Sequence, residues 1–259
     1  MERLDKIIAS QGKYSRSEVK KLVKSGLVRV NGSVVKSSDI KCDADTDEII
    51  VDGVLLNYKK HIYIMLNKPK GVISATEDVI QKTVIDLVPS ELKRAGLFPA
   101  GRLDGDTTGF VLITDDGDFA HRILSPKNHI MKTYHATLER PLTDKDIAKF
   151  KEGLTLGDGT KCLEAHVRML PEKENVAEVI ICEGKYHQVK RMFASLGNKV
   201  LELRRVKMGN LPLDENLPEG SCRELTAGEV EQVQFGIRNS ECNQRFSAYY
   251  NDKLKKQMY

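Results

Sequence analysis

The segment of residues 101–109 is a polar loop whose side chains could do chemistry. It reads G-R-L-D-G-D-T-T-G and directly precedes residues 110–113, an apolar run typical of a buried strand. Its carboxylates, Asp104 and Asp106, could be turn residues, a metal-binding pair or catalytic groups. Aspartate often stabilises turns by bonding its own backbone, whereas two carboxylates without a neighbouring His or Cys make a poor transition-metal site. The residue types alone leave the turn and the catalytic interpretations open.

Two further segments hold side chains that could act together with a carboxylate. Tyr134 lies in residues 133–138, where polar and apolar residues alternate as in a strand, and a core tyrosine is the simplest interpretation. A helix is predicted near residue 190 from four apolar residues at i, i+3, i+4 and i+7: Val189, Met192, Phe193 and Leu196. Lys190 points to the other face of this helix, with Lys185 and Arg191 close by. For His187 and Gln188, a hydrogen-bonded helix start is at least as good an interpretation as a substrate contact.

The elements that must position these groups begin with a strand at residues 62–66. Its apolar residues alternate with the others at a period of two, and it ends at the sequence K-P-K-G, residues 68–71. A second strand is predicted at residues 110–113 and a third ends near residue 182. The polar loop therefore connects to a sheet, and the predicted helix follows the third strand.

The N-terminal part of the chain predicts a separate basic module. Ser15 and Glu18 fit a capping box that starts a helix, and Gly26 ends it. Three cations at i, i+4 and i+8 form a stripe on this helix: Arg16, Lys20 and Lys24. A strand and a tight turn at Asn31-Gly32 follow, which predicts a hairpin. By itself, such a stripe is more often a solvated face than a binding surface.

The distribution of charge separates this module from the remainder. Residues 1–41 hold ten Lys or Arg against four acids, a net charge of +6, while the whole chain of 259 residues carries +4. A basic surface at one end favours a polyanionic partner such as nucleic acid. No apolar run approaches the ~18 residues of a membrane span, so we expect a cytoplasmic protein. The five cysteines are widely spaced and form no C-x-x-C pair, so we expect reduced thiols and no structural zinc.

Three stretches of the N-terminal module, in order, resemble the S4 RNA-binding domain: R-L-D-K-I-I from residue 3, S-R-S-E-V from residue 15 and S-G-L-V-R-V-N-G from residue 25. The resemblance covers about the first fifty residues. It implies that the stripe of Arg16, Lys20 and Lys24 meets the phosphates of structured RNA, an interaction that weakens as salt rises. S4 domains occur on several unrelated enzymes, so this part does not identify a reaction.

The loop at 101–109, with its G-R-L-D and T-T-G, resembles the signature loop of RsuA-type pseudouridine synthases. The similarity continues in order through L-I-T-D-D-G from residue 112, H-R-I from 121, S-P from 125, K-T-Y from 132, E-G-K-Y-H-Q-V-K-R-M-F from 183, and Leu203. With the S4 stretches it covers roughly residues 1–234. The family implies an α+β fold: a small S4 domain followed by a catalytic domain with a mixed, mainly antiparallel sheet.

The resemblance implies three catalytic residues. Asp104 matches the family's essential aspartate, which attacks the target uridine or takes a proton in any of the proposed routes. Tyr134 matches the tyrosine that stacks on the uracil and is implicated in removing its C5 proton. Lys190 matches the basic residue that pairs with the aspartate and keeps it ionised, although Lys185 and Arg191 lie close enough in the sequence to be alternatives for this role.

The resemblance also implies four residues that bind the substrate. Arg102 matches an arginine that fills the space left by the flipped nucleotide, and Leu203 an apolar residue that closes the uracil pocket. Lys185 and Arg191 match basic RNA-binding positions. Many relatives carry arginine where this chain has Lys185, which weakens a bidentate phosphate contact. No cofactor and no metal is implied.

The sequence therefore predicts a synthase that isomerises uridine in 16S ribosomal RNA. The alternatives are a sister-branch enzyme acting on 23S RNA and a non-catalytic RNA-binding factor of ribosome assembly. The expected partner is ribosomal RNA or a small-subunit assembly intermediate, with the protein a monomer. We predict an S4 domain at residues 1–59, a catalytic domain at 60–238 and a tail of unknown role at 239–259.

Overall fold

The computed structural model describes residues 1–173 and 175–234, so the predicted tail at 239–259 lies outside the described residues. The chain forms two compact units. The first contains Met1–Ile62 and also Val88–Leu97. The second begins at Tyr63, leaves out Val88–Leu97 and resumes at Phe98.

The first unit packs two helices, α1 (Leu4–Ser10) and α2 (Arg16–Lys24), against a small antiparallel sheet of order β3-β2-β5-β6. Its strands are β2 (Val28–Val30), β3 (Ser33–Val34), β5 (Ile49–Val51) and β6 (Val54–Leu55), while β1 (Glu2–Arg3) pairs with β4 (Lys41–Cys42). The core consists of aliphatic side chains from both helices and the sheet. This unit corresponds to the helix, helix and hairpin that the sequence predicts.

Local signals account for the boundaries within this unit. Ser15 accepts a hydrogen bond from the Glu18 amide, and the Glu18 carboxylate accepts from the Ser15 amide, so the predicted capping box is confirmed. Asn31 and Gly32 both have positive φ angles, 51° and 78°, as the predicted hairpin between β2 and β3 requires.

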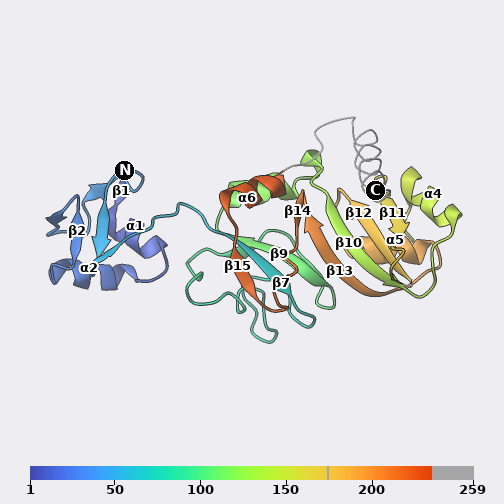
Figure 1. Cartoon of the computed structure of the whole chain (residues 1–259), viewed down its shortest axis with the longest axis horizontal. Coiled ribbons are helices and arrows are strands. Elements are labelled where there is room, and N and C mark those ends of the chain that lie inside the picture. The colour runs from blue at the N-terminus through green and yellow to red at the C-terminus, as the bar shows by residue number, and fades with distance from the viewer. Residues whose placement is uncertain (174, 235–259) are drawn as a thin grey trace. The chain divides into compact units, whose positions relative to one another are not determined.

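The second unit is built on a nine-stranded sheet (Figure 1). Seven strands follow the order β11-β12-β10-β13-β9-β7-β15, and the other two, β14 and β8, pair with β13 and β9. The strands are β7 (Tyr63–Lys68), β8 (Phe98–Pro99), β9 (Thr108–Thr114), β10 (Lys132–Leu138), β11 (His166–Met169), β12 (Val176–Ile181), β13 (Val200–Met208), β14 (Leu211–Pro212) and β15 (Cys222–Glu224). Every pairing is antiparallel except β13 with β9. The predicted α+β fold with a mixed, mainly antiparallel sheet is confirmed.

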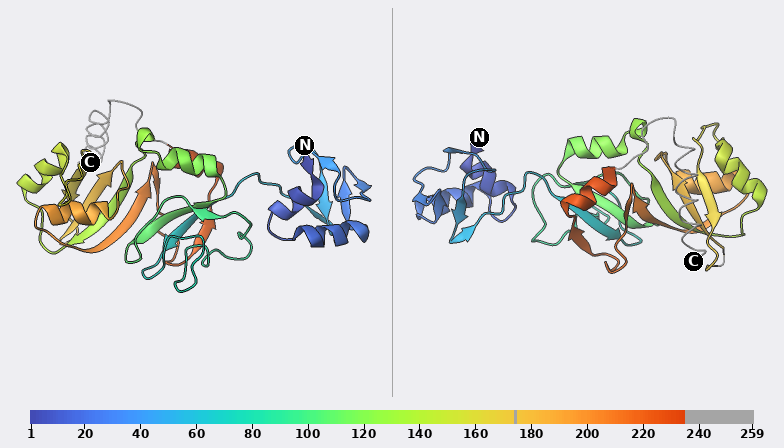
Figure 2. Two further views of the ribbon diagram at one scale, coloured as in Figure 1. Left: turned by 180° about the vertical axis from the view of Figure 1, so that it is seen from behind. Right: turned by 45° about the horizontal axis from the view of Figure 1, so that its top comes forward.

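Helices pack near both ends of this sheet (Figures 1 and 2). At the β10–β12 end lie α4 (Asp144–Glu152) and α5 (Gln188–Ser195), whose rings Phe150 and Phe193 are 5.0 Å apart. At the β7–β15 end lie α3 (Gly117–Leu124) and α6 (Ala227–Gln234), with a short 3-10 turn at Pro126–Asn128 after α3. The core of that end joins side chains of β7, β9, α3 and α6.

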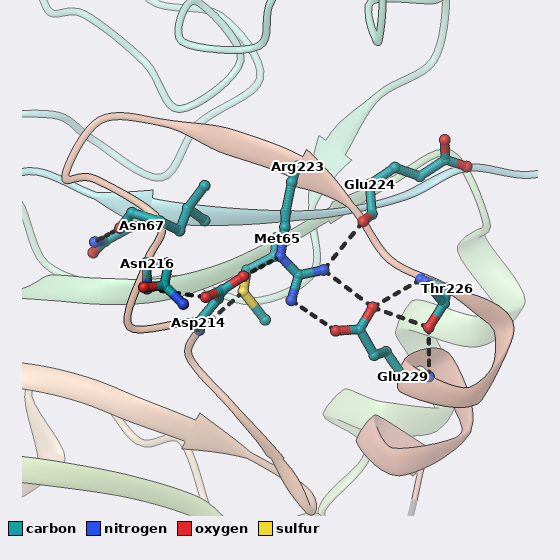
Figure 3. Close-up of polar contacts among 9 residues, drawn as sticks. Met65, Asn67, Asp214, Asn216, Arg223, Glu224, Thr226 and Glu229 are labelled. Carbon is teal, nitrogen blue, oxygen red and sulfur yellow. Dashed lines mark hydrogen bonds and ion pairs between the residues drawn. The ribbon is translucent and has the colours of Figure 1, made fainter.

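An ion-paired network holds the last strand to the last described helix (Figure 3). Arg223 on β15 donates to Asp214 at 2.7 Å and to both carboxylate oxygens of Glu229 on α6. Thr226 adds two hydrogen bonds to Glu229. The Arg223 guanidinium beside it lowers the pKa of the Glu229 carboxyl to about 2.

The parallel pairing of strands β13 and β9 requires a glycine. Gly109 lies opposite Arg205 with a φ of 99°, and a Cβ added there would stand 2.2 Å from the Arg205 carbonyl oxygen. No other residue type fits this backbone without moving it. This close pairing fixes the position at which the loop of residues 101–107 enters β9, relative to β13.

Candidate active site

Lys68, at the end of β7, stabilises the loop that carries Asp104 by hydrogen bonds to its backbone. The Lys68 ammonium donates to the carbonyl oxygens of Gly105 at 3.3 Å and Thr107 at 2.9 Å, and also to that of Pro69 at 3.0 Å. Burial lowers the pKa of Lys68 to about 8. This role was not predicted from the sequence, although Lys68 continues the apolar alternation of Ile64 and Leu66 and so stands on a face where a cation is unexpected.

Further hydrogen bonds fix the loop from the segment after β7. The Ser74 hydroxyl donates to the Leu103 carbonyl and accepts from the Leu103 amide, both at 3.0 Å. The Gly71 amide donates to the Gly105 carbonyl at 2.8 Å. The backbone on both sides of Asp104 is therefore fixed before any ligand arrives, and a carboxylate on such a loop has a defined position.

Lys190 lies between the two loop carboxylates. Its ammonium stands 3.1 Å from Asp104 Oδ2 and 2.6 Å from Asp106 Oδ1. These two hydrogen bonds raise the pKa of Lys190 against the opposing effect of burial, and the bond from Lys190 lowers the pKa of Asp106. The predicted partnership of Lys190 with Asp104 is present in the geometry, and Asp106 shares the cation.

A small pocket of about 60 Å³ opens beside Asp104. Five predicted site residues line it together: Arg102, Asp104, Tyr134, Lys185 and Leu203. The remaining lining comes from the loop, the end of β12 and the start of α5, namely Leu103, Thr107, Ile181, Gly184, His187, Gln188 and Val189. Tyr134 and Leu203 are buried on neighbouring strands, so an aromatic and an aliphatic residue line the same pocket as Asp104.

The start of α5 forms one wall of the pocket. Gln188 is buried, accepts from the Lys185 amide at 2.9 Å and donates to Glu183 at 2.9 Å, as expected of a hydrogen-bonded helix start. His187 has a left-handed backbone, with φ 47°, and its Nε2 lies 3.3 Å from Asp104 Oδ1. Its ring stacks on Tyr186 at 3.8 Å, and Tyr186 is 75% exposed.

Two of the predicted basic residues are engaged elsewhere. Arg191 pairs with Asp158 at 2.5 Å and donates to the Tyr186 carbonyl, and it does not line the pocket. Lys185 lines the pocket but its ammonium pairs with Glu183. Their role in binding RNA stays a prediction.

The predicted RNA-binding stripe lies in the first unit. Arg16, Lys20 and Lys24 are exposed on α2, while Val19 and Val23 on the other side of the helix are buried. The stripe is therefore open to solvent along its length.

The described residues were compared with the side-chain groups that a metal ion requires. Within residues 1–173 and 175–234, no three His, Cys, Asp or Glu side chains gather to hold an ion, and the four cysteines there form no disulfide. No helix among the described residues is long and apolar enough to cross a membrane.

Three further residues around the pocket were not predicted from the sequence. Thr107 is buried in its lining, and Lys132 and Arg205 are buried on the strands that carry Tyr134 and Leu203. A signal was present for Arg205, because it continues the alternation of Leu203 on β13. The strand pairing that places it beside Tyr134 could not be derived from the sequence.

Comparisons with known proteins identify the family of each part of the chain. Residues 62–195 match the RNA pseudouridylate synthase family, and residues 2–49 match the S4 domain. An uncharacterized RNA pseudouridine synthase of Bacillus subtilis, YtzG, is 46% identical over 230 residues, which are 88% of this chain and 96% of that protein.

A protein of Haemophilus influenzae named ribosomal small subunit pseudouridine synthase A is 43% identical over 234 residues, 89% of this chain and 99% of its own. A crystal structure described as a pseudouridylate synthase matches with a TM-score of 0.62 and 42% identity, over 90% of this chain and all of that one.

Proposed function

This chain belongs to the RNA pseudouridylate synthase family and carries an S4 domain. We therefore propose that it converts a uridine of small-subunit ribosomal RNA to pseudouridine. Asp104 is the attacking carboxylate in this proposal. The observation that carries the proposal is the pocket that Asp104 lines together with Tyr134 and Leu203, with Lys190 paired to Asp104. The relatives named as small-subunit enzymes support the choice of RNA.

The proposed chemistry needs each of these groups. The bond between N1 of uracil and C1′ of ribose must break, and the base must turn and rejoin through C5. A carboxylate can add to the base or to the sugar carbon, or can remove a sugar proton. The Lys190 ammonium, 3.1 Å from Asp104 Oδ2, holds the carboxylate in position for any of these steps. The Tyr134 ring stacks on the flipped base, and its hydroxyl takes part in removing the proton from C5.

RNA can reach the pocket through exposed side chains. Arg102, which lines the pocket, is exposed, and Tyr186 beside the lining residue His187 is exposed as well.

RNA recognition is assigned to both units. We propose that the α2 stripe of Arg16, Lys20 and Lys24 contacts phosphates, since exposed cations on one helix face suit a polyanion. Arg102, Lys185 and Leu203 then contact the target nucleotide. The substrate is ribosomal RNA, either alone or in a small-subunit assembly intermediate, which places the protein in the cytoplasm.

The test compares wild type, Asp104→Asn and Asp106→Asn on unmodified small-subunit RNA, large-subunit RNA and small-subunit particles. Pseudouridine is mapped by carbodiimide labelling and primer extension. We expect a stop in small-subunit RNA or particles with wild type and with Asp106→Asn, and none with Asp104→Asn. The Asp106 variant is the matched control, because it removes a carboxylate from the same loop and from the same lysine.

Other outcomes separate the alternatives. A stop only in large-subunit RNA would move the chain to a sister branch. No stop with any RNA or particle would favour a non-catalytic binding factor. Equal stops with Asp104→Asn and wild type would reject the role of Asp104 but keep the activity.

A further inference from the structure

Two buried polar atoms stand out beside the pocket. In residues 1–173 and 175–234, the buried side-chain nitrogen or oxygen atoms without a hydrogen-bond partner are Thr107 Oγ1 and Arg205 Nη2. Thr107 is 1% exposed and belongs to the pocket lining. Arg205 is 2% exposed and lies opposite Gly109 on one side and Tyr134 on the other.

Such atoms are costly to the folded protein. Buried hydroxyl and guanidinium groups almost always find partners, and an unpaired one loses its hydration without compensation. A threonine at this buried lining position could be replaced by the isosteric valine with no loss of packing. Its hydroxyl is therefore expected to meet a partner that arrives with a ligand.

The surroundings favour an electron-rich partner. Lys132 and Tyr134 lie two residues apart on β10, and Arg205 is paired with Tyr134 across the ladder, so all three share one face of the sheet. In the part of the chain that the structure describes, Lys132 and Arg205 form no ion pair with a carboxylate, and they donate instead to the carbonyl oxygens of Ile130 and Phe110. Two buried cations therefore lie on the strands that carry the lining residues Tyr134 and Leu203.

The behaviour of Lys132 agrees with an uncompensated positive region. Burial, followed by the nearby Arg205, lowers its pKa to about 8. A negative charge brought into the adjacent pocket would be attracted by both cations, because electrostatic interactions are strong where water is excluded.

We propose that the Thr107 hydroxyl donates a hydrogen bond to a carbonyl oxygen of the target base and so stabilises the negative charge that the base carries during isomerisation. The proposal rests on the proposed function. Thr107 would be a catalytic residue in addition to Asp104, Tyr134 and Lys190.

The electron count of the reaction explains why this charge arises. When the C1′–N1 bond breaks, its electron pair stays on the base and spreads over N1, O2 and O4. The base then forms the C5–C1′ bond, C5 loses its proton and N1 gains one, so the product is an isomer and no oxidant is needed. If Asp104 instead adds first to the base, charge again collects on a carbonyl oxygen. A fixed donor to that oxygen is most effective when the charge is largest.

The first experiment compares Thr107→Val with Thr107→Ser and wild type in single-turnover reactions on the RNA that the wild type modifies. We expect Val to lower the maximal rate at least about tenfold and Ser to retain most of it. RNA affinity, measured by filter binding, should stay within about twofold, because the phosphates supply most of it.

Thermal unfolding of the same variants distinguishes a purely structural hydroxyl. Removing an unpaired buried hydroxyl should leave the melting temperature of Thr107→Val equal to or above that of wild type. A lower melting temperature restored by Ser would show that the hydroxyl has an internal partner and would overturn the proposal. A wild-type rate for Thr107→Val would do the same.

The second experiment changes the base. RNA carrying 2-thiouridine or 4-thiouridine at the target places a poorer acceptor at one carbonyl position. One of the two should slow wild type, with little further effect on Thr107→Val. If both thio-substitutions slow the two proteins equally, the hydroxyl contacts neither oxygen and the proposal fails. Activity of wild type on unmodified uridine, with none from Asp104→Asn, keeps this failure separate from a failure of the proposed function.

Discussion

At the scale of single residues, the site depends on how one lysine is divided between two carboxylates. Lys190 is closer to Asp106 than to Asp104, although Asp104 lines the pocket and Asp106 does not. Asp106 is also the more exposed of the two side chains, with 61% exposed against 27%. Its pairing with Lys190 is therefore the better screened by solvent, while the same cation also reaches the partly enclosed Asp104 that lines the pocket.

Replacing Lys190 tests this division. We expect Lys190→Met to lower the single-turnover rate about 100-fold or more, since the carboxylate of Asp104, the proposed nucleophile, loses its cation. Lys190→Arg should stay within about tenfold of wild type, because arginine keeps the charge with a different geometry. Rates are measured on the RNA that wild type modifies, with circular dichroism as the folding control. A Met variant as active as Arg would contradict the pairing role.

At the scale of elements, two helices serve the function in different ways. Residues near the N-terminus of α5 help to build the pocket, and the helix is anchored by Gln188 and by its packing against α4. In α2 the capping box and the buried Val19 and Val23 fix the helix, which leaves the opposite face to the cationic stripe. One helix shapes a cavity and the other presents charge to solvent.

The stripe on α2 predicts a salt-dependent contribution to RNA binding. The triple change of Arg16, Lys20 and Lys24 to Gln should weaken binding and reduce the slope of log affinity against log salt by up to about one unit for each phosphate that the variant no longer binds. Stability should change little, because these side chains are exposed. Filter binding at salt concentrations from about 50 to about 200 mM measures the slope.

Helix α4 provides the matched control for that experiment. Its exposed Lys145, Lys149 and Lys151 carry the same three charges on a helix of the second unit. Changing these three to Gln should leave the slope unchanged if the stripe binds RNA specifically. An equal loss from both triple variants would mean that only overall charge matters.

At the scale of the whole molecule, the second unit is closed by strands far apart in the chain. β15 pairs with β7, the first strand of the unit, so residues near 223 complete a sheet that starts at residue 63. The Arg223 network with Asp214 and Glu229 then holds α6 to this edge. Lys68, which supports the loop that carries Asp104, is on the strand between β15 and β9.

The closure predicts a pH dependence of stability. The pKa of Glu229 is depressed from 4.5 to about 2 in the folded protein. The unfolded chain therefore binds the proton first, and the stabilisation by Glu229 is full above about pH 4.5 and is lost as the pH falls toward 2. We expect Glu229→Gln to unfold at a lower urea concentration than wild type at pH 7. The free energy of unfolding should fall by about 1–2 kcal/mol.

The difference between wild type and Glu229→Gln is the quantity to follow. Urea unfolding at several pH values from 7 to 3 should show it shrinking steadily below pH 4.5. Glu215→Gln is the matched control, since Glu215 follows Asp214 in the chain but stands outside the network of Figure 3. A difference that stays constant down to pH 3 would contradict the role of the ion pair.

Much of the site could be predicted from the sequence, for a physical reason. The capping box, the Asn31-Gly32 hairpin and the strand alternations depend on residues within a few positions of one another, and the structure confirms them. The polar loop with Asp104 was identified as a signature by its local order of residues. The resemblance then supplied Tyr134, Lys190 and Leu203, which the structure brings to one place.

The tertiary structure alone decided which distant side chains meet. The sharing of Lys190 between two carboxylates, the support of the loop by Lys68, and the position of Arg205 beside Tyr134 all join residues that are tens of positions apart. Sheet order and register determine these contacts, and a register shift of one residue turns every side chain to the opposite face. The unpaired hydroxyl of Thr107 is likewise visible only once its neighbours are in place.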